Sequence, residues 1–271
     1  MMVLPSADFR LAFLLMVRSR LILTGLLLCA VVAACTWLVA QFSPRQPGTV
    51  ALDVGISLIR IAVPVLALLQ IQDLVMREVE RKLILFSMTY PRPRAAFLLG
   101  RYLAVIAASF GVTASLALTV AIVVASIGPA SAQGTQVALG LPYVLTCALI
   151  WCDVAVVVAF GTALAVVATT PHLVFVGGLG FMIIARSATA VIALLEREQD
   201  LLPGADLYHQ GLLWVQWIIP DLGALDVRAI ALYGKMELLT IPAWAMVAMP
   251  LGCIGVLLSF SIYRFARREF T

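Results

Sequence analysis

Long apolar runs alternate with short polar connections along most of the chain. A helix needs about 20 apolar residues to cross the hydrocarbon core of a bilayer, which is about 30 Å thick. Six runs reach this length, and the third exceeds it, so that its ends must protrude or the helix must tilt. The pattern therefore predicts six membrane-spanning helices, at about residues 21–42, 51–71, 96–127, 139–168, 173–195 and 243–263.

Residues 1–20 differ from the spans because they mix apolar side chains with Asp8, Arg10, Arg18 and Arg20. This mixture predicts an amphipathic helix that lies at the lipid headgroups, followed by a six-span domain over residues 21–271. The region lacks the small-residue cleavage pattern of a signal peptide, so we expect the first span to be retained.

Residues 196–242 are too polar for a span and too apolar for an ordinary loop. Their longest mostly apolar run, 212–219, is too short to cross a bilayer, and Pro220 and Asp221 end it. The run predicts an interfacial or re-entrant segment on the extracytoplasmic side, with Trp214 and Trp217 at the level of the headgroups.

The composition agrees with a membrane protein. Of the 271 residues, 63% are hydrophobic and 12% are charged, whereas a soluble domain carries about 25% charged residues. The mean hydropathy is +1.08. We expect an all-α polytopic membrane protein with little room for a soluble enzyme domain.

Basic residues are distributed unevenly between the two sides that six spans define. With both termini in the cytoplasm, twelve Lys and Arg residues fall on the cytoplasmic side and four on the outer side. Cytoplasmic loops carry such an excess of Lys and Arg. We therefore expect a multi-pass membrane protein with both termini in the cytoplasm.

Motifs for nucleotide, metal or nucleophilic chemistry are missing from the sequence. Neither lysine, Lys82 nor Lys235, follows a glycine-rich loop of the Walker type, and no HExxH, GxSxG or Cys/His cluster occurs. The five cysteines all lie in apolar runs without a CxxC pair, which favours packing over disulfides or metal binding. We expect no enzyme activity, catalytic residue, cofactor or metal in this chain, so transport would need an ion gradient or a separate ATPase.

The connection between the second and third predicted spans, residues 77–101, is the longest charged stretch. Its first part, REVERK, predicts a short surface helix that ends at Pro91 and Pro93. A new helix is expected to begin near Ala95. Six of the eighteen basic residues lie in this connection, namely Arg77, Arg81, Lys82, Arg92, Arg94 and Arg101.

Residues 74–101 resemble the first cytoplasmic region of ABC-2 type (type V) ABC transporter permeases. In that family an acidic-basic helix leads into a Pro-x-x-Arg turn, and a Gly-Lys/Arg pair opens the third span. The matching residues are Glu78, Glu80, Arg81, Lys82, the run Tyr90 to Arg94, and Leu99-Gly100-Arg101. A weaker similarity to the stretch before the last span of family members covers Ile219 to Leu222 and Leu225 to Arg228.

The resemblance implies a coupling helix that docks into an ATPase subunit. Two such subunits would bind ATP and Mg, and a second copy of this chain, or a related permease, would complete the complex. The residues implied in ATPase coupling are Glu78, Glu80, Arg81, Lys82, Leu85, Phe86, Tyr90, Pro91 and Arg94. The alternative is a loop that serves only to set the topology.

Charged residues inside the spans form a second candidate site. Exposure of Arg60, Asp153 or Arg186 to lipid would cost about 2.5–3.5 kcal/mol each, so they should face the bundle interior and can pair there. Asp53 lies seven residues before Arg60 and shares its helix face. These charges are either a structural ion pair, or contacts for an anionic substrate (Arg60 and Arg186) or a proton path (Asp153).

The resemblance therefore implies the permease subunit of an ATP-binding cassette transporter that exports or extracts a substrate across a bacterial inner membrane. One alternative is a scaffold or sensor subunit that uses the same ATPase contact mechanically, and another is an ion-coupled carrier that uses Asp153. Membrane lipid and an accessory protein at residues 196–242 are further expected partners, and nucleic acid is not.

Overall fold

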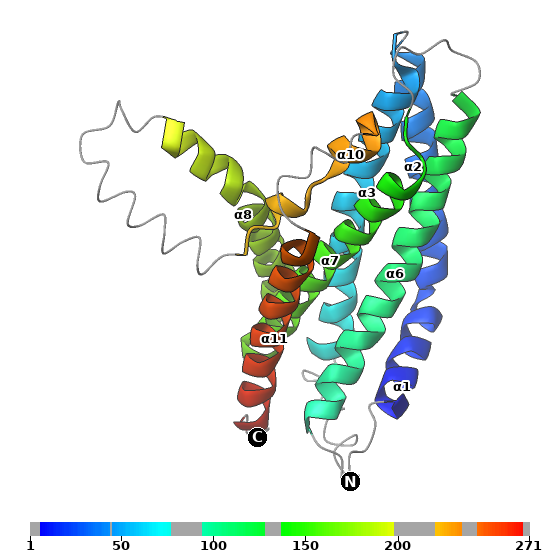
Figure 1. Cartoon of the computed structure of the whole chain (residues 1–271). Helices are drawn as coiled ribbons and strands as arrows, with labels where there is room; N and C mark the ends of the chain where they lie inside the picture. The colour runs from blue at the N-terminus through cyan, green and yellow to red at the C-terminus, as the bar shows by residue number, and fades with distance from the viewer. Residues whose placement is uncertain are drawn as a thin grey trace.

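The computed structural model describes residues 6–43, 45–76, 94–127, 137–197, 220–234 and 243–267, and every regular element in these ranges is a helix (Figure 1). Two of the elements are short π-helical turns and one is a 3-10 turn. The elements are α1 (Ser6–Met16), η1 (Val17–Leu21), α2 (Ile22–Gln41), α3 (Pro47–Ile71), η2 (Gln72–Met76), α6 (Arg94–Ile127), α7 (Leu141–Val167), α8 (Pro171–Arg197), η5 (Gly223–Leu225), α10 (Arg228–Tyr233) and α11 (Ala243–Arg267).

Six helices among the described residues are long and apolar enough to span a membrane, which confirms the predicted number. Their ends differ from the predicted ones by a few residues. Helix α3 begins at Pro47, so that Pro47 and Gly48, which were expected in a loop, belong to the helix. Proline suits the first turn because a backbone N–H is not needed there.

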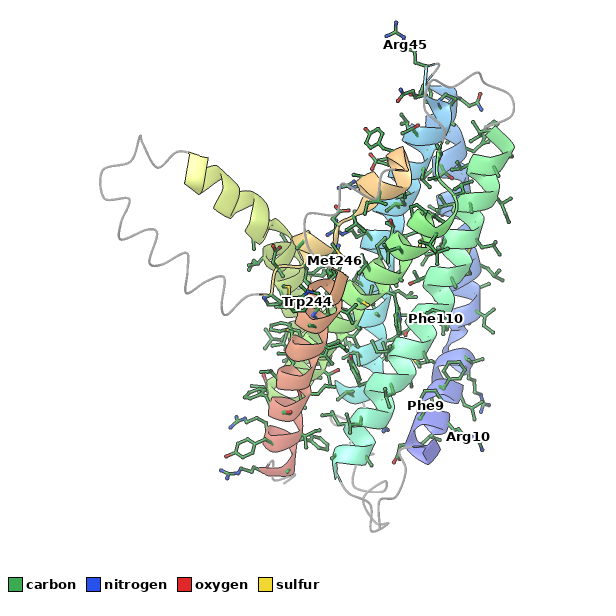
Figure 2. All side chains as sticks on the ribbon, in the orientation of Figure 1. Phe9, Arg10, Arg45, Phe110, Trp244 and Met246 are labelled. Carbon is green, nitrogen blue, oxygen red and sulfur yellow. The ribbon has the colours of Figure 1, made fainter. Side chains whose placement is uncertain are left out.

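The beginning of α1 and the end of α11 lie at the same end of the bundle, as an even number of spans requires (Figure 1). The end of η2 and the start of α6 also lie toward this end. We call residues 77–93, which follow η2 and precede α6 in the sequence, the 77–93 connection. Figure 2 shows Arg10 near this end and Arg45 at the opposite one. We call the end that holds Arg10 the terminal end.

Helix α1 packs along the first turns of α6 and joins α2 through η1. The close approach depends on Gly100, since a Cβ atom there would lie 2.8 Å from the Cβ of Asp8. Ala12 and Met16 of α1 are buried. Arg20 has a φ of 69°, in the left-handed region that is rare for a residue with a side chain, so the chain bends between α1 and α2. A headgroup position for α1 stays a prediction.

Helix α7 forms the centre of the bundle. Of its most apolar 18-residue stretch, 67% of the residues are buried, whereas the value for α2 is 11%. Helix α7 contacts α3, α6, α8 and α11. The side chain of Leu68, from α3, enters this centre and is fully buried. A Cβ atom at Gly161 of α7 or at Gly178 of α8 would lie 2.9 Å or 2.5 Å from the Cδ2 atom of Leu68. The two glycines therefore allow three spans to meet around one leucine.

The outer surface of the bundle is apolar. Figure 2 shows side chains along the outside of the helices, with Phe110 labelled on α6 and Trp244 on α11. Phe110 is 57% exposed and Trp244 is 74% exposed. Exposed apolar surface on this scale is expected for helices that face lipid.

Residues 220–234 fold back against the spans rather than lying free. Leu222, Leu225 and Ile230 are buried in a cluster with residues of α7, α8 and α11. The backbone N–H of Leu222 donates to the carbonyl of Ala185 in α8, at 3.1 Å. Gly234 ends α10 in the left-handed conformation, with a φ of 67°. We call Pro220–Gly234 the docked segment; α10, within it, crosses α3 in Figure 1.

Candidate functional site

Six charged side chains from α3, α7, α8 and the docked segment form one series of contacts that runs from the inside of the helix bundle to its surface. We call them the ion cluster. Three are arginines and three are aspartates, so their formal charges sum to zero. Ion pairs connect them in the order Arg186, Asp153, Arg60, Asp226, Arg228 and Asp53.

The innermost contact joins Asp153, near the middle of α7, to Arg186 of α8. The Nε atom of Arg186 donates to Oδ2 of Asp153 at 3.0 Å, and its Nη2 atom contacts the same oxygen. Asp153 is 1% exposed, so its charge is removed from solvent. Its other oxygen, Oδ1, has no hydrogen-bond partner among the described residues and can still accept one.

Arg60 bridges the two halves of the cluster. Its Nε atom lies 3.9 Å from Oδ2 of Asp153, and its Nη1 atom pairs with Asp226 of the docked segment. Its Nη2 atom donates to the carbonyl of Leu222 at 3.2 Å. One residue thus connects α3, α7 and the docked segment. Pro64, one turn further along α3, cannot donate the usual helical hydrogen bond to the carbonyl of Arg60.

The outer contacts fasten the docked segment to α3. The Nη1 atom of Arg228 lies 3.2 Å from Oδ1 of Asp53 and 2.9 Å from Oγ of Ser57, and its Nη2 atom lies 3.0 Å from Oδ2 of Asp226. Asp53, Ser57 and Arg60 follow one another at helical spacing on one face of α3. The Arg228 and Asp53 side chains are 40% and 44% exposed, so solvent weakens this pair relative to the inner one.

The cluster brings together the three intramembrane residues that the sequence singled out. Arg60, Asp153 and Arg186 face the interior, and Asp153 contacts both arginines. Asp53 does share a helix face with Arg60, but each of them pairs with a residue of the docked segment. Because signs alternate along the cluster, every charge has an opposite charge as its neighbour. This arrangement lowers the cost of burying the charges.

Most residues implied in ATPase coupling lie outside the described residues. These are Glu78, Glu80, Arg81, Lys82, Leu85, Phe86, Tyr90 and Pro91, and the same holds for Trp214 and Trp217. Arg94 is the first residue of α6.

Pro220 and Asp221 open the docked segment and are partly buried. The Oδ1 atom of Asp221 accepts a hydrogen bond from the backbone N–H of Ala224 at 3.2 Å, which supports the turn of η5. The two residues therefore belong to the segment that carries the ion cluster. Their extracytoplasmic position stays a prediction.

Three residues of the described sites were given no site role from the sequence, although each lies in a stretch that was matched to a family pattern. Asp226 and Arg228 belong to the ion cluster, and the signal for them was an Asp-x-Arg pair placed among Leu222, Leu225 and Ile230. Arg101 was counted with the basic residues on the cytoplasmic surface, whereas the structure buries it to 2% exposure. The signal that set Arg101 apart from its basic neighbours was its place in the Leu99-Gly100-Arg101 match at the start of the third span.

Metal binding finds no support in the described ranges, since no three His, Cys, Asp or Glu residues there gather as metal ligands. The six-residue cluster alternates cations and anions instead. Such an arrangement can hold helices together, or it can exchange partners when helices move.

Comparison with known protein families relates the sequence to transporters. The family model described as "ABC-2 family transporter protein" matches residues 13–270. The match includes all six candidate spans and every residue of the ion cluster. No curated protein matches the sequence.

Proposed function

Since the chain belongs to the ABC-2 family of transporter membrane proteins, we propose that it moves or extracts a substrate across a bacterial inner membrane as the permease subunit of an ABC transporter. Permeases of this family lack an ATPase domain of their own. The energy for transport therefore comes from a separate ATPase, which we propose is present in two copies. The observation that carries the proposal is the family match over nearly the whole chain.

The orientation that we propose places the terminal end in the cytoplasm. Support comes from the basic residues, because Arg10, Arg264 and Arg267 belong to this end, together with the basic residues of the 77–93 connection. Arg45 lies at the opposite end (Figure 2). Lys and Arg are enriched on the cytoplasmic side of membrane proteins.

The ATPase contact that we propose is the 77–93 connection, with Glu80 and Arg81 pairing at the rim of a groove and Leu85 and Phe86 inserting into it. This connection joins η2, which continues α3, to α6. Closure of the two ATPases would then displace both of these spans. A second copy of the chain supplies the other half of the pathway in this proposal.

The ion cluster, in our proposal, holds the docked segment against the spans. Its three arginines each have an aspartate partner, so the cluster offers no excess positive charge to an anionic substrate. Asp153 is likewise held within the cluster, between Arg186 and Arg60. Holding the segment requires only the contacts described above.

Purification of the tagged protein in mild detergent, followed by mass spectrometry and an ATPase assay, tests the proposal. We expect an ATPase at about equal stoichiometry. Reversal of the charges at Glu80 and Arg81 should abolish its binding or its coupling to transport, whereas reversal of the exposed Arg10 should leave both unchanged. A clean preparation without an ATPase would contradict the proposal and favour a carrier driven by an ion gradient. A bound ATPase without transport of any labelled compound would favour the scaffold or sensor.

A further inference from the structure

Arg101 lies seven residues inside α6 and is buried at the terminal end of the bundle, with 2% exposure. A buried guanidinium group is costly unless its donors and its charge are matched by neighbouring groups. The contacts of Arg101 and of the residues beside it involve three other elements of the chain. They therefore indicate what this buried charge does.

The first contact closes the base of the 77–93 connection. The Nε atom of Arg101 donates to the backbone carbonyl of Leu74, in η2, at 3.1 Å. Leu74 precedes the connection and Arg101 follows it, so the hydrogen bond ties the chain entering the connection to the chain leaving it. A cation beside a carbonyl in the last described turn of a helix is also favoured by the helix dipole.

The second set of contacts extends to α11 and α1. The guanidinium carbon of Arg101 lies 3.4 Å from the centre of the Phe97 ring, one turn earlier in α6. Phe97 stacks in turn on Phe265 of α11, with ring centres 5.8 Å apart and planes 5° from parallel. On the adjoining face, Gly100 lets the backbone of α1 approach at Asp8. Four elements thus meet at the first two turns of α6.

We infer that Arg101 is a positioning residue that makes η2 and α6 move as one body when the 77–93 connection is displaced. The inference rests on the proposed function, because it assigns to the connection the role of receiving the movement of an ATPase. The Arg101 hydrogen bond adds a polar tie between η2 and α6 to the packing of α3 against α6. With it, displacement of the connection passes to α3 and α6 together, and through Phe97 to α11.

The chemistry of this contact requires arginine rather than lysine. A guanidinium group is planar, so it stacks on the Phe97 ring while Nε, at its edge, donates to the Leu74 carbonyl. A lysine ammonium keeps the charge but has no planar face and no donor at the Nε position. Arg101→Lys should therefore fold and bind the ATPase while losing the rigid connection.

The experiment uses the complex with its co-purifying ATPase and a cysteine reporter in α6. Ser109→Cys places the reporter two turns beyond Arg101 at a buried position, 2% exposed. Its reactivity with a water-soluble maleimide is compared between the nucleotide-free and the vanadate-trapped complex. The native cysteines to be replaced by alanine in this parent are Cys29, Cys35, Cys147, Cys152 and Cys253.

We expect the parent to show a difference in reactivity of about threefold or more between the two states, as a shifted conformational population requires. Arg101→Lys and Arg101→Gln should bind and hydrolyse ATP normally but lose most of that difference. Arg10→Gln, which removes an exposed arginine at the same end, should behave as the parent does. Arg101→Lys is the deciding variant if Arg101→Gln assembles poorly.

Two results would overturn the inference and leave the proposed function intact. One is a reporter difference that survives in Arg101→Lys. The other is a parent complex whose reporter does not respond to nucleotide although the ATPase is bound. Absence of an ATPase from the parent preparation would instead overturn the proposed function. A purely structural role for Arg101 would lower thermal stability without changing the response of the reporter to nucleotide.

Discussion

Replacing Asp153 with asparagine removes a negative charge from a side chain that is 1% exposed, and leaves its shape almost unchanged. Arg60 retains Asp226 as a partner, but Arg186 loses the carboxylate to which its Nε atom donates at 3.0 Å. Breaking a buried pair in this way costs about 3–5 kcal/mol. Because the Arg186 side chain is 14% exposed, we expect a free-energy loss near the lower limit, about 3 kcal/mol.

The matched double variant separates the cost of the unpaired charge from the value of the pair. Asp153→Asn with Arg186→Gln removes both charges, and neutral replacement of a buried pair is often tolerated. We expect this double variant to be more stable than Asp153→Asn alone by about 2 kcal/mol. The free energy of unfolding is measured by SDS titration in mixed micelles, followed by tryptophan fluorescence. Asp53→Asn, at the exposed outer pair, serves as the control and should cost less than about 1 kcal/mol.

Two outcomes would refute this reasoning. If the losses of the two single variants add in the double variant, Asp153 and Arg186 do not stabilise each other. If Asp153→Asn is as stable as the wild type but abolishes transport, Asp153 acts on a substrate or a proton and the structural role that we propose for the ion cluster is wrong.

Packing and hydrogen bonding give three more predictions, each measured as a shift of melting temperature in detergent. Gly178→Ala should lose about 1–3 kcal/mol, because its Cβ atom would lie 2.5 Å from Leu68, whereas Gly180→Ala, with no atom within 4 Å, should be neutral or slightly stabilising. Leu68→Ala should lose about 2–5 kcal/mol alone, but combined with Gly178→Ala it should lose less than the sum. Tyr143→Phe removes a hydroxyl that donates to the carbonyl of Ala117 at 2.7 Å and should lose about 1 kcal/mol. The packing argument for Gly178 would be contradicted if Gly178→Ala and Gly180→Ala lost equal stability. The contact between Leu68 and Gly178 would be contradicted if the double variant lost the sum of the two single losses. The hydrogen-bond argument would be contradicted if Tyr143→Phe melted at the temperature of the wild type.

The spans were predictable because the thickness of a bilayer sets the length of an apolar helix. The same argument did not predict the first residue of α3. Pro47 and Gly48 are poor residues for a helix interior but good ones for its first turn, and hydropathy does not distinguish the two positions. An apolar run therefore predicts a span better than it predicts the residues at which the helix begins.

The partners of the charged residues were predictable only in part. Helical spacing correctly placed Asp53 and Arg60 on one face of α3. The cost of exposing a charge to lipid correctly predicted that Arg60, Asp153 and Arg186 face the interior. Spacing cannot tell which distant element faces a helix, and so it missed the pairing of α3 with Asp226 and Arg228.

The residues of the ion cluster are synthesised at different times, because they lie far apart in the sequence. Arg60 is 162 residues ahead of Leu222, whose carbonyl it binds, and Asp53 is 175 residues ahead of Arg228. A ribosome adds about 5–20 residues per second, so α3 is complete roughly 8–30 s before the docked segment exists. During that interval the docked-segment partners of Asp53 and Arg60 have not yet been made, and Arg60 gains Asp153 only once α7 is synthesised. We therefore expect α3 to stay beside the insertion machinery, or in contact with water, until α7 and the docked segment arrive.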